Sequence, residues 1–215
     1  MVAAIETTPR RPTLWPAAVA GIAGPIIFTA LVVVQGLLNP EYNHLALTIS
    51  ALAAWPSGWI QNINFFVLGV LMVAYAIGLN LGMRQGKGGL IGPALLVVSG
   101  LGLLVAGSFP MSRAGTAFVV PPGHLVGAVL SFLGAGIGLV VISRRLASDP
   151  GWRGLSTYTL MTGVAMLILF LVTFTVGRSP DSPLGPWGGL IQRLTVLLWF
   201  ACTMILAWRL RRVQP

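Results

Sequence analysis

Long stretches without a charged residue are the feature that most constrains this chain. With histidine counted as neutral, no Asp, Glu, Lys or Arg occurs in the runs 12–40, 42–83, 88–112, 114–143, 154–177 and 194–208. Each of the first five holds the roughly 20 apolar residues that a helix needs to cross a hydrocarbon core about 30 Å thick. A chain of this kind is expected to fold within a bilayer, as a polytopic membrane protein.

The composition excludes the other classes of protein. Hydrophobic residues make up 56% of the 215 positions and charged residues only 8%, whereas a soluble domain is nearer a quarter charged. The single cysteine, Cys202, excludes a disulfide-stabilised secreted scaffold. The sequence pI of about 11.5 would suggest nucleic acid as a partner. The basic residues separate the apolar runs instead of forming a patch, so no nucleic-acid partner is expected.

The apolar runs are continuous and show no alternation of period two, which favours helices over a membrane barrel. We therefore predict an all-α fold, a bundle of six transmembrane helices within residues 14–208. The predicted spans are 14–38, 60–82, 90–109, 123–143, 156–177 and 189–208. Short tails, 1–13 and 209–215, would flank this domain.

The basic residues are distributed unevenly over the connections between the predicted spans. Ten of the thirteen fall on one side: Arg10, Arg11, Arg84, Lys87, Arg144, Arg145, Arg153, Arg209, Arg211 and Arg212. Only Arg113, Arg178 and Arg193 fall toward the other side. The positive-inside rule assigns the richer side to the cytoplasm. We therefore expect a multi-pass protein of the cell (inner) membrane with both termini in the cytoplasm.

The fourth predicted span carries small residues at a spacing that favours close helix packing. Two small-xxx-small pairs occur in it, made by Gly123, Gly127, Gly134 and Gly138. Packing within the monomer is the favoured interpretation, and a homo-oligomer is the alternative.

Most polar side chains outside the basic loops fall on the outer side, where 39–59 is the longest connection. Leu45, Ile49 and Leu52 recur there at helical spacing, which predicts a short helix over 44–54 in the outer interface. If the chain is helical from Glu41, one face also carries Glu41, His44 and Thr48. A functional site is therefore expected here.

Arg193 is the most informative single residue, because it falls about one turn into the last predicted span. A charge at that depth is costly unless it reaches the surface or meets a partner. We expect Arg193 to be buried and paired with an acidic group, either Glu41, Asp181 or a bound anion. A structural ion pair is the favoured interpretation, and an anion site for a lipid phosphate or carboxylate is the alternative.

The leading functional hypothesis combines this arginine with nearby amides in a polar pocket at the outer leaflet. Arg193 would contact the anionic group of a lipid or small amphiphile. Its hydrogen-bonding neighbours would be Gln192, Asn62, Asn64 and His124. The two asparagines are also well explained as the capped first turn of the second span, and His124 as a capping or interface histidine.

Two further functions are weighed against binding. An intramembrane enzyme could use Glu41 and His44, which have metal-ligand spacing, together with His124 for acid–base or metal chemistry. A metal site on these three residues is the weaker expectation, and no cofactor is expected. A small transporter is disfavoured because no ionisable residue falls near mid-bilayer.

Several short motifs carry a resemblance to a known family. They are Ile49-Ser50, the segment from Asn62 to Phe66, Gly107-Ser108-Phe109-Pro110, His124 and Gln192-Arg193. Over about residues 17–208 the chain resembles the bacterial six-helix membrane family called domain of unknown function nine-nine-eight. Members commonly carry an aspartate shortly after the Phe-Pro, where this chain has Met111, Ser112 and Arg113. The resemblance implies the six-helix fold and no particular activity.

Overall fold

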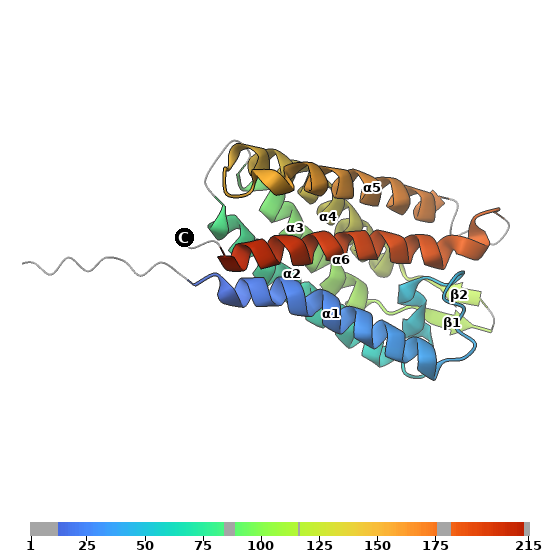
Figure 1. The fold of residues 1–215 in the computed structure, drawn as a ribbon. Helices are drawn as coiled ribbons and strands as arrows, with labels where there is room; N and C mark the ends of the chain where they lie inside the picture. Colours follow the sequence, from blue (N-terminus) through green and yellow to red (C-terminus); the bar gives the residue numbers. More distant parts are fainter. Residues whose placement is uncertain (1–12, 84–88, 116, 176–181, 213–215) are drawn as a thin grey trace, which may run out of the picture.

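Six apolar helices run back and forth along one direction in the computed structural model, which describes residues 13–83, 89–115, 117–175 and 182–212 (Figure 1). They are α1 (Trp15–Leu38), α2 (Gly58–Gly82), α3 (Ile91–Ser108), α4 (Pro122–Ser148), α5 (Ser156–Thr175) and α6 (Gly188–Arg212). Short 3-10 helices precede three of them: η1 (Ile49–Ala54), η2 (Arg153–Leu155) and η3 (Gly185–Trp187). A small antiparallel hairpin joins α3 to α4, with strands β1 (Ser112–Ala114) and β2 (Ala117–Val119).

All six helices are long and apolar enough to cross a membrane. The surface of the bundle is apolar as well, as on α5, where Ile168 and Leu171 are about 60% exposed (58% and 60%). An aqueous solvent would not favour such a surface, whereas a bilayer would. The predicted all-α, multi-pass fold is confirmed.

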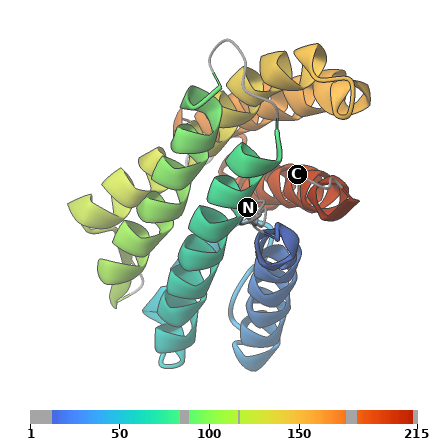
Figure 2. The same cartoon turned by 90° about the vertical axis from the view of Figure 1, so that its left-hand side faces the viewer.

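The helices are arranged as a closed ring. Each helix packs against the next one along the chain, and α6 returns to pack against α1. Viewed along the bundle, α6 lies between α1 and α5 (Figure 2). Sequential neighbours run antiparallel because the connections between them are short.

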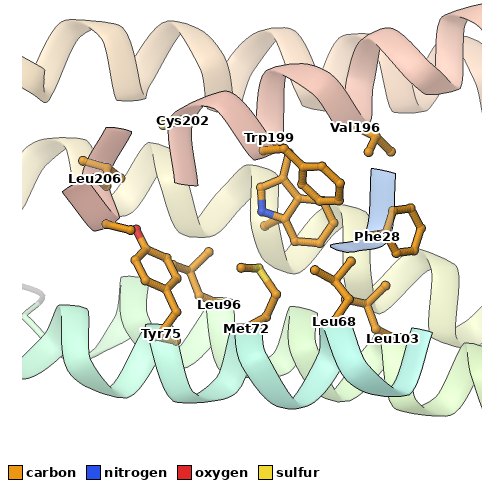
Figure 3. Packing of buried hydrophobic residues seen from close by; sticks show 14 of the residues in the cluster. Phe28, Leu68, Met72, Tyr75, Leu96, Leu103, Val196, Trp199, Cys202 and Leu206 are labelled. Carbon is orange, nitrogen blue, oxygen red and sulfur yellow. The ribbon is translucent and has the colours of Figure 1, made fainter. Parts of the chain in front are cut away.

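Large side chains from α2 and α6 fill the middle of this ring (Figure 3). Tyr75 and Met72 of α2 are buried against the side of the bundle formed by α6, which contributes Trp199 and Leu206. Phe28 of α1 adds an edge-on ring contact to Phe200, with 5.5 Å between the centroids. The core is therefore continuous along the bundle.

The beginning of α1 and the end of α6 lie at the same end of the bundle, here called the termini end (Figure 1). The opposite end, called the hairpin end, carries β1–β2, residues 39–57 and the beginning of α6. The even number of spans places the beginning of α1 and the end of α6 on one side. Of the predicted tails, 1–13 lies outside the described residues except for Thr13. In the tail 209–215, residues 209–212 belong to α6 and the rest lies outside the described residues.

Two predicted features differ in the structure. The helix expected over 44–54 is wrong, since only Ile49–Ala54 forms a 3-10 helix and the preceding residues form turns. The carbonyls of His44, Leu45, Ala46 and Leu47 accept hydrogen bonds from α6, as described below. The fourth and sixth spans also continue beyond 143 and 208, to Ser148 and Arg212. Their polar last turns emerge from the apolar region, so hydropathy alone does not mark where they end.

Candidate functional site

At the hairpin end, residues 44–49 fold over the beginning of α6. The first backbone N–H groups of a helix have no partner within the helix. Here the N–H of Gly189 donates to the carbonyl of Ala46 at 3.1 Å, and that of Leu190 donates to the carbonyl of Leu45 at 2.9 Å. The loop therefore caps α6 through its backbone, which is why the loop cannot also form a regular helix.

Arg193 holds the same loop from one turn further along α6. Its Nη1 donates to the carbonyls of His44 at 2.6 Å, Leu47 at 3.0 Å and Gly189 at 2.9 Å. Its Nη2 donates to the hydroxyl of Tyr42 at 2.6 Å. A planar guanidinium has donors in several fixed directions and suits such a set of acceptors.

The predicted acidic partner of Arg193 is not found. Within the described part of the chain its acceptors are carbonyl groups, a phenol and an imidazole nitrogen, not carboxylates. Glu41 is exposed in the turn after α1, and Asp181 lies outside the described residues. The prediction considered only charged groups as partners, whereas several carbonyl groups can together accept the hydrogen bonds of a guanidinium. Arg193 is half-buried, and its hydrogen bonds attach the loop to α6.

The aromatic residues beside Arg193 respond to its charge. Burial raises the pKa of the Tyr42 phenol, and the Arg193 guanidinium acts in the opposite direction. Partial burial, followed by the charge of Arg193, lowers the pKa of His44. His44 is therefore neutral at neutral pH, so its Nδ1 can accept from Nη2 of Arg193, 3.3 Å away.

Gln192 links the loop to a cavity inside the bundle. Its Oε1 accepts from the backbone N–H of Ile49 at 2.7 Å. This bond turns the side chain inward, and Gln192 lines the cavity together with Ser50. Among the described residues no acceptor is given for its Nε2, which leaves this amide nitrogen able to donate.

His124 lies across the cavity, in the first turn of α4, and is only 4% exposed. Its Nδ1 is 3.0 Å from the carbonyl of Ala106 and 3.1 Å from that of Phe109. Both partners are acceptors, so Nδ1 carries a proton and donates to them. His124 thus caps the end of α3 while it lines the cavity.

The cavity has a volume of about 90 Å³ and is enclosed by α4, α5, α6 and the residues around η1. A second space of about 50 Å³ lies deeper toward α2 and α3, and both share Ser50, His124, Ala128, Phe132 and Gln192 as lining. The remaining lining of the first is Thr48, Met111, Val120, Leu125, Phe170, Thr173, Phe174 and Thr195. The lining therefore combines polar side chains with aromatic rings.

The aromatic wall separates α4 from α6. Phe132 of α4 stacks on Phe170 of α5 with 5.0 Å between the centroids, and lies 6.4 Å from the Trp199 ring of α6. Flat rings packed against one another cover area but fill an irregular space poorly, which leaves room beside them. This arrangement can hold a small molecule with one hydrogen-bonding end and an apolar remainder.

Asn62 and Asn64 do not line this cavity. Asn64 is fully buried and donates from Nδ2 to the carbonyl of Phe28 at 3.1 Å, tying α2 to α1. Oδ1 of both asparagines is buried with no hydrogen-bond partner in the described residues. Asn64 is therefore part of the α1–α2 contact, whereas the backbone carbonyl of Asn62 lies beside Gly107 of α3.

The contact between α1 and α2 also includes Gln35 of α1, which the sequence analysis did not single out. Gln35 Nε2 donates to Gln61 Oε1 at 2.9 Å, and both side chains are fully buried. Asn39 donates to the Gln35 carbonyl at 2.7 Å. An amide inside an otherwise apolar span was the available signal, since a polar side chain within a membrane seeks a partner on another helix.

The residues proposed for metal or acid–base chemistry are not brought together as a cluster. In the described ranges, no group of three or more His, Cys, Asp or Glu side chains is placed to hold a metal ion. Glu41 and His44 are exposed on the loop, whereas His124 is buried beneath it. The geometry offers hydrogen bonding and apolar contact in the cavity.

These features define the class of the protein: a multi-pass integral membrane protein whose six helices enclose a small cavity near one end. The family described as "Protein of unknown function (DUF998)" matches residues 22–209, and the chain belongs to this family. The resemblance noted in the sequence is thereby confirmed. No curated protein and no solved structure matches the chain.

Proposed function

We propose that this protein binds a neutral amphiphile, such as a lipid with a hydroxyl, ester or carbonyl head, in the cavity between α4, α5 and α6. The amphipathic lining of that cavity carries the proposal. The lining contains the polar side chains of Ser50, His124 and Gln192 together with the rings of Phe132 and Phe170. Ligand sites of this kind are largely apolar, with a few polar groups that fix orientation.

A neutral head group fits the cavity better than the anionic one expected from the sequence. The lining residues include no Asp, Glu, Lys or Arg. Arg193 is the expected anion-binding residue, but its N–H groups donate to the loop carbonyls and to the hydroxyl of Tyr42. A buried anion without a cation would be strongly disfavoured in so apolar a space, whereas Gln192 Nε2 can donate to an uncharged oxygen.

We also propose in which membrane the protein lies and which end of the bundle faces the cytoplasm. The termini end, which carries the basic Arg144, Arg209, Arg211 and Arg212, would face the cytoplasm of a cell (inner) membrane. The hairpin end would then lie at the outer leaflet, so the ligand would reach the cavity from that leaflet.

The test blocks the cavity without removing a hydrogen bond. Ala128 lines both spaces, and Ala128→Leu adds three carbon atoms there. Val126→Leu is the matched control, because Val126 is on the same helix and its side chain is 54% exposed. Protein purified in mild detergent would be analysed by native mass spectrometry for retained uncharged lipid. We expect Ala128→Leu to weaken retention about tenfold, equivalent to ~1.4 kcal/mol, and the control to retain the wild-type amount.

Equal retention by Ala128→Leu and wild type would place any bound lipid elsewhere on the protein and overturn the proposal. Wild-type protein that neither retains nor takes up an uncharged amphiphile would also overturn it. The melting temperature of each variant shows whether Ala128→Leu is folded. If it is not, Ala128→Val gives the same comparison with a smaller side chain.

A further inference from the structure

A second hollow lies at the opposite, termini end of the bundle. It has a volume of about 490 Å³ and lies between the α4–α5 connection and the last turns of α6. Its wall combines Trp152, Leu155, Ile205 and Trp208 with two cationic side chains, Arg209 and Arg212. It shares no residue with the cavity described above.

One of these arginines is held in place at the rim of the hollow. Arg209 donates from Nε to the carbonyl of Gly151 at 2.8 Å. Its Nη groups have no acceptor within the described ranges, so two donor groups of a positioned guanidinium remain available. Guanidinium groups suit phosphate oxygens, because they present parallel donors in a fixed plane.

Arg212 adds a second positive charge at the same rim. Its side chain is exposed, and its guanidinium lies 5.4 Å from the centre of the Trp208 ring. Arg211 lies over the same ring at 3.8 Å but does not line the hollow. Stacking on an indole orients a guanidinium and leaves its edge donors usable.

The nearby acid offsets only part of the positive charge at the rim. Asp149 is only 7% exposed, and its Oδ1 accepts from the backbone N–H of Gly151 at 2.9 Å. Its negative charge also interacts with Arg145 of α4. Since one carboxylate lies near the two guanidinium groups of Arg209 and Arg212, the rim keeps a net positive charge.

Polarity changes in a definite order along α6. Ile205, which is 41% exposed, precedes Arg209 by one helical turn, so the apolar wall lies on the bilayer side and the charges lie at the end of the bundle. Trp208 lies between them, as aromatic residues do at a membrane interface. A phospholipid presents its acyl chains and then its phosphate in this same order.

We propose that this hollow binds an anionic phospholipid, with its phosphate group at Arg209 and Arg212 and an acyl chain along Leu155 and Ile205. Charge complementarity and the match in polarity along α6 support this occupant. The site is independent of the proposed cavity ligand, since it lies at the other end and takes an anion rather than a neutral head.

The experiment measures binding of phosphatidylglycerol to the detergent-solubilised full chain by titration followed by native mass spectrometry. Phosphatidylcholine, which has the same phosphate but no net charge, is titrated in parallel. We expect the double change Arg209→Gln and Arg212→Gln to weaken phosphatidylglycerol binding roughly tenfold or more. Arg144→Gln is the matched control, because Arg144 is an exposed arginine at the same end that does not line the hollow.

Three outcomes would overturn the proposal. The double variant could bind phosphatidylglycerol like wild type, or Arg144→Gln could weaken binding as much, which would indicate diffuse surface charge. Inorganic phosphate alone could raise the melting temperature as much as phosphatidylglycerol does, which would indicate a free-phosphate site. If the double variant does not fold, Arg212→Gln replaces it, since the structure gives Arg212 no hydrogen bond that this change would remove. Arg212→Gln should then weaken binding about fivefold.

Discussion

Arg193 illustrates how a single charge is accommodated near the membrane. Its N–H groups donate to the carbonyl oxygens of His44 and Leu47, which precede it by 149 and 146 residues in the sequence. A charge-assisted hydrogen bond is roughly twice as strong as a neutral one. Several such bonds replace the ion pair that the sequence suggested, and they make Arg193 the residue that attaches the outer loop to α6.

We therefore expect Arg193→Gln to destabilise the protein by about 3 kcal/mol, because several charge-assisted hydrogen bonds are lost together. Arg193→Lys should recover only part of this loss, since an ammonium group cannot reach His44, Leu47 and Tyr42 at once. Thermal unfolding in detergent, monitored by circular dichroism, measures both variants.

Arg113→Gln provides the control for this prediction. Arg113 is exposed at the same end of the bundle, and its contacts are with the Trp55 and Phe118 rings at 5.0 and 5.5 Å. Its loss should cost no more than about 1 kcal/mol. An effect of Arg193→Gln as small as that of Arg113→Gln would show that the loop is held mainly by other bonds.

At the scale of elements, the closest helix contact joins α3 and α4 through glycines. A Cβ atom on Gly127 would lie 2.4 Å from the backbone nitrogen of Ala106 and 2.7 Å from the carbonyl oxygen of Gly102. Gly134 similarly approaches the backbone of Leu95 and Ser99. The glycine pattern therefore serves packing within the monomer, as the sequence predicted. A homo-oligomer would have to use another surface.

Gly127→Ala tests this contact. Alanine is favoured over glycine inside a helix by up to about 1 kcal/mol, but here the new Cβ meets backbone atoms that cannot rotate away. We expect the clash to dominate and the free energy of unfolding to fall by about 1–3 kcal/mol. Denaturation in detergent gives the value.

Gly154→Ala is the matched control, because a Cβ atom there would meet nothing within 4 Å. It should change stability by less than about 0.5 kcal/mol. Equal stability of Gly127→Ala and wild type would mean that α3 and α4 can separate at little cost.

At the scale of the whole molecule, the six spans leave the beginning of α1 and the end of α6 on one side (Figure 1). Charge then decides which side this is. Positive residues near the ends of spans are retained in the cytoplasm during insertion. The termini end carries Arg144, Arg145, Arg153, Arg209, Arg211 and Arg212, whereas the described hairpin end carries Arg113 and Arg193.

We expect a reporter fused after Pro215 to be active in the cytoplasm and a cysteine at Ser182 to react with a membrane-impermeant reagent in intact cells. Background labelling should be low, because the native Cys202 is buried. The unmodified chain is the control. Labelling of Ser182→Cys only after the membrane is permeabilised would reverse the orientation and place the cavity at the inner leaflet.

The spans could be predicted from the sequence because hydropathy is a local property. Continuous apolar runs cannot leave backbone groups unpaired in lipid, so each run must be helical. For the candidate site, the structure places Gln192 and His124 at a cavity. Arg193 and Asn64 form hydrogen bonds between segments, and Glu41 and His44 are exposed on the loop.

The sequence by itself determined the number of spans, the all-α class and the family. Only the tertiary structure decided the partners of the polar side chains, because a polar side chain has alternative partners and the nearest one depends on which segments meet. The carbonyls of His44 and Leu47 became partners of Arg193 once the loop packed on α6. The cavity likewise forms where α4, α5, α6 and the loop meet, with Phe132 and Phe170 in its lining, and no local pattern in the sequence records this meeting.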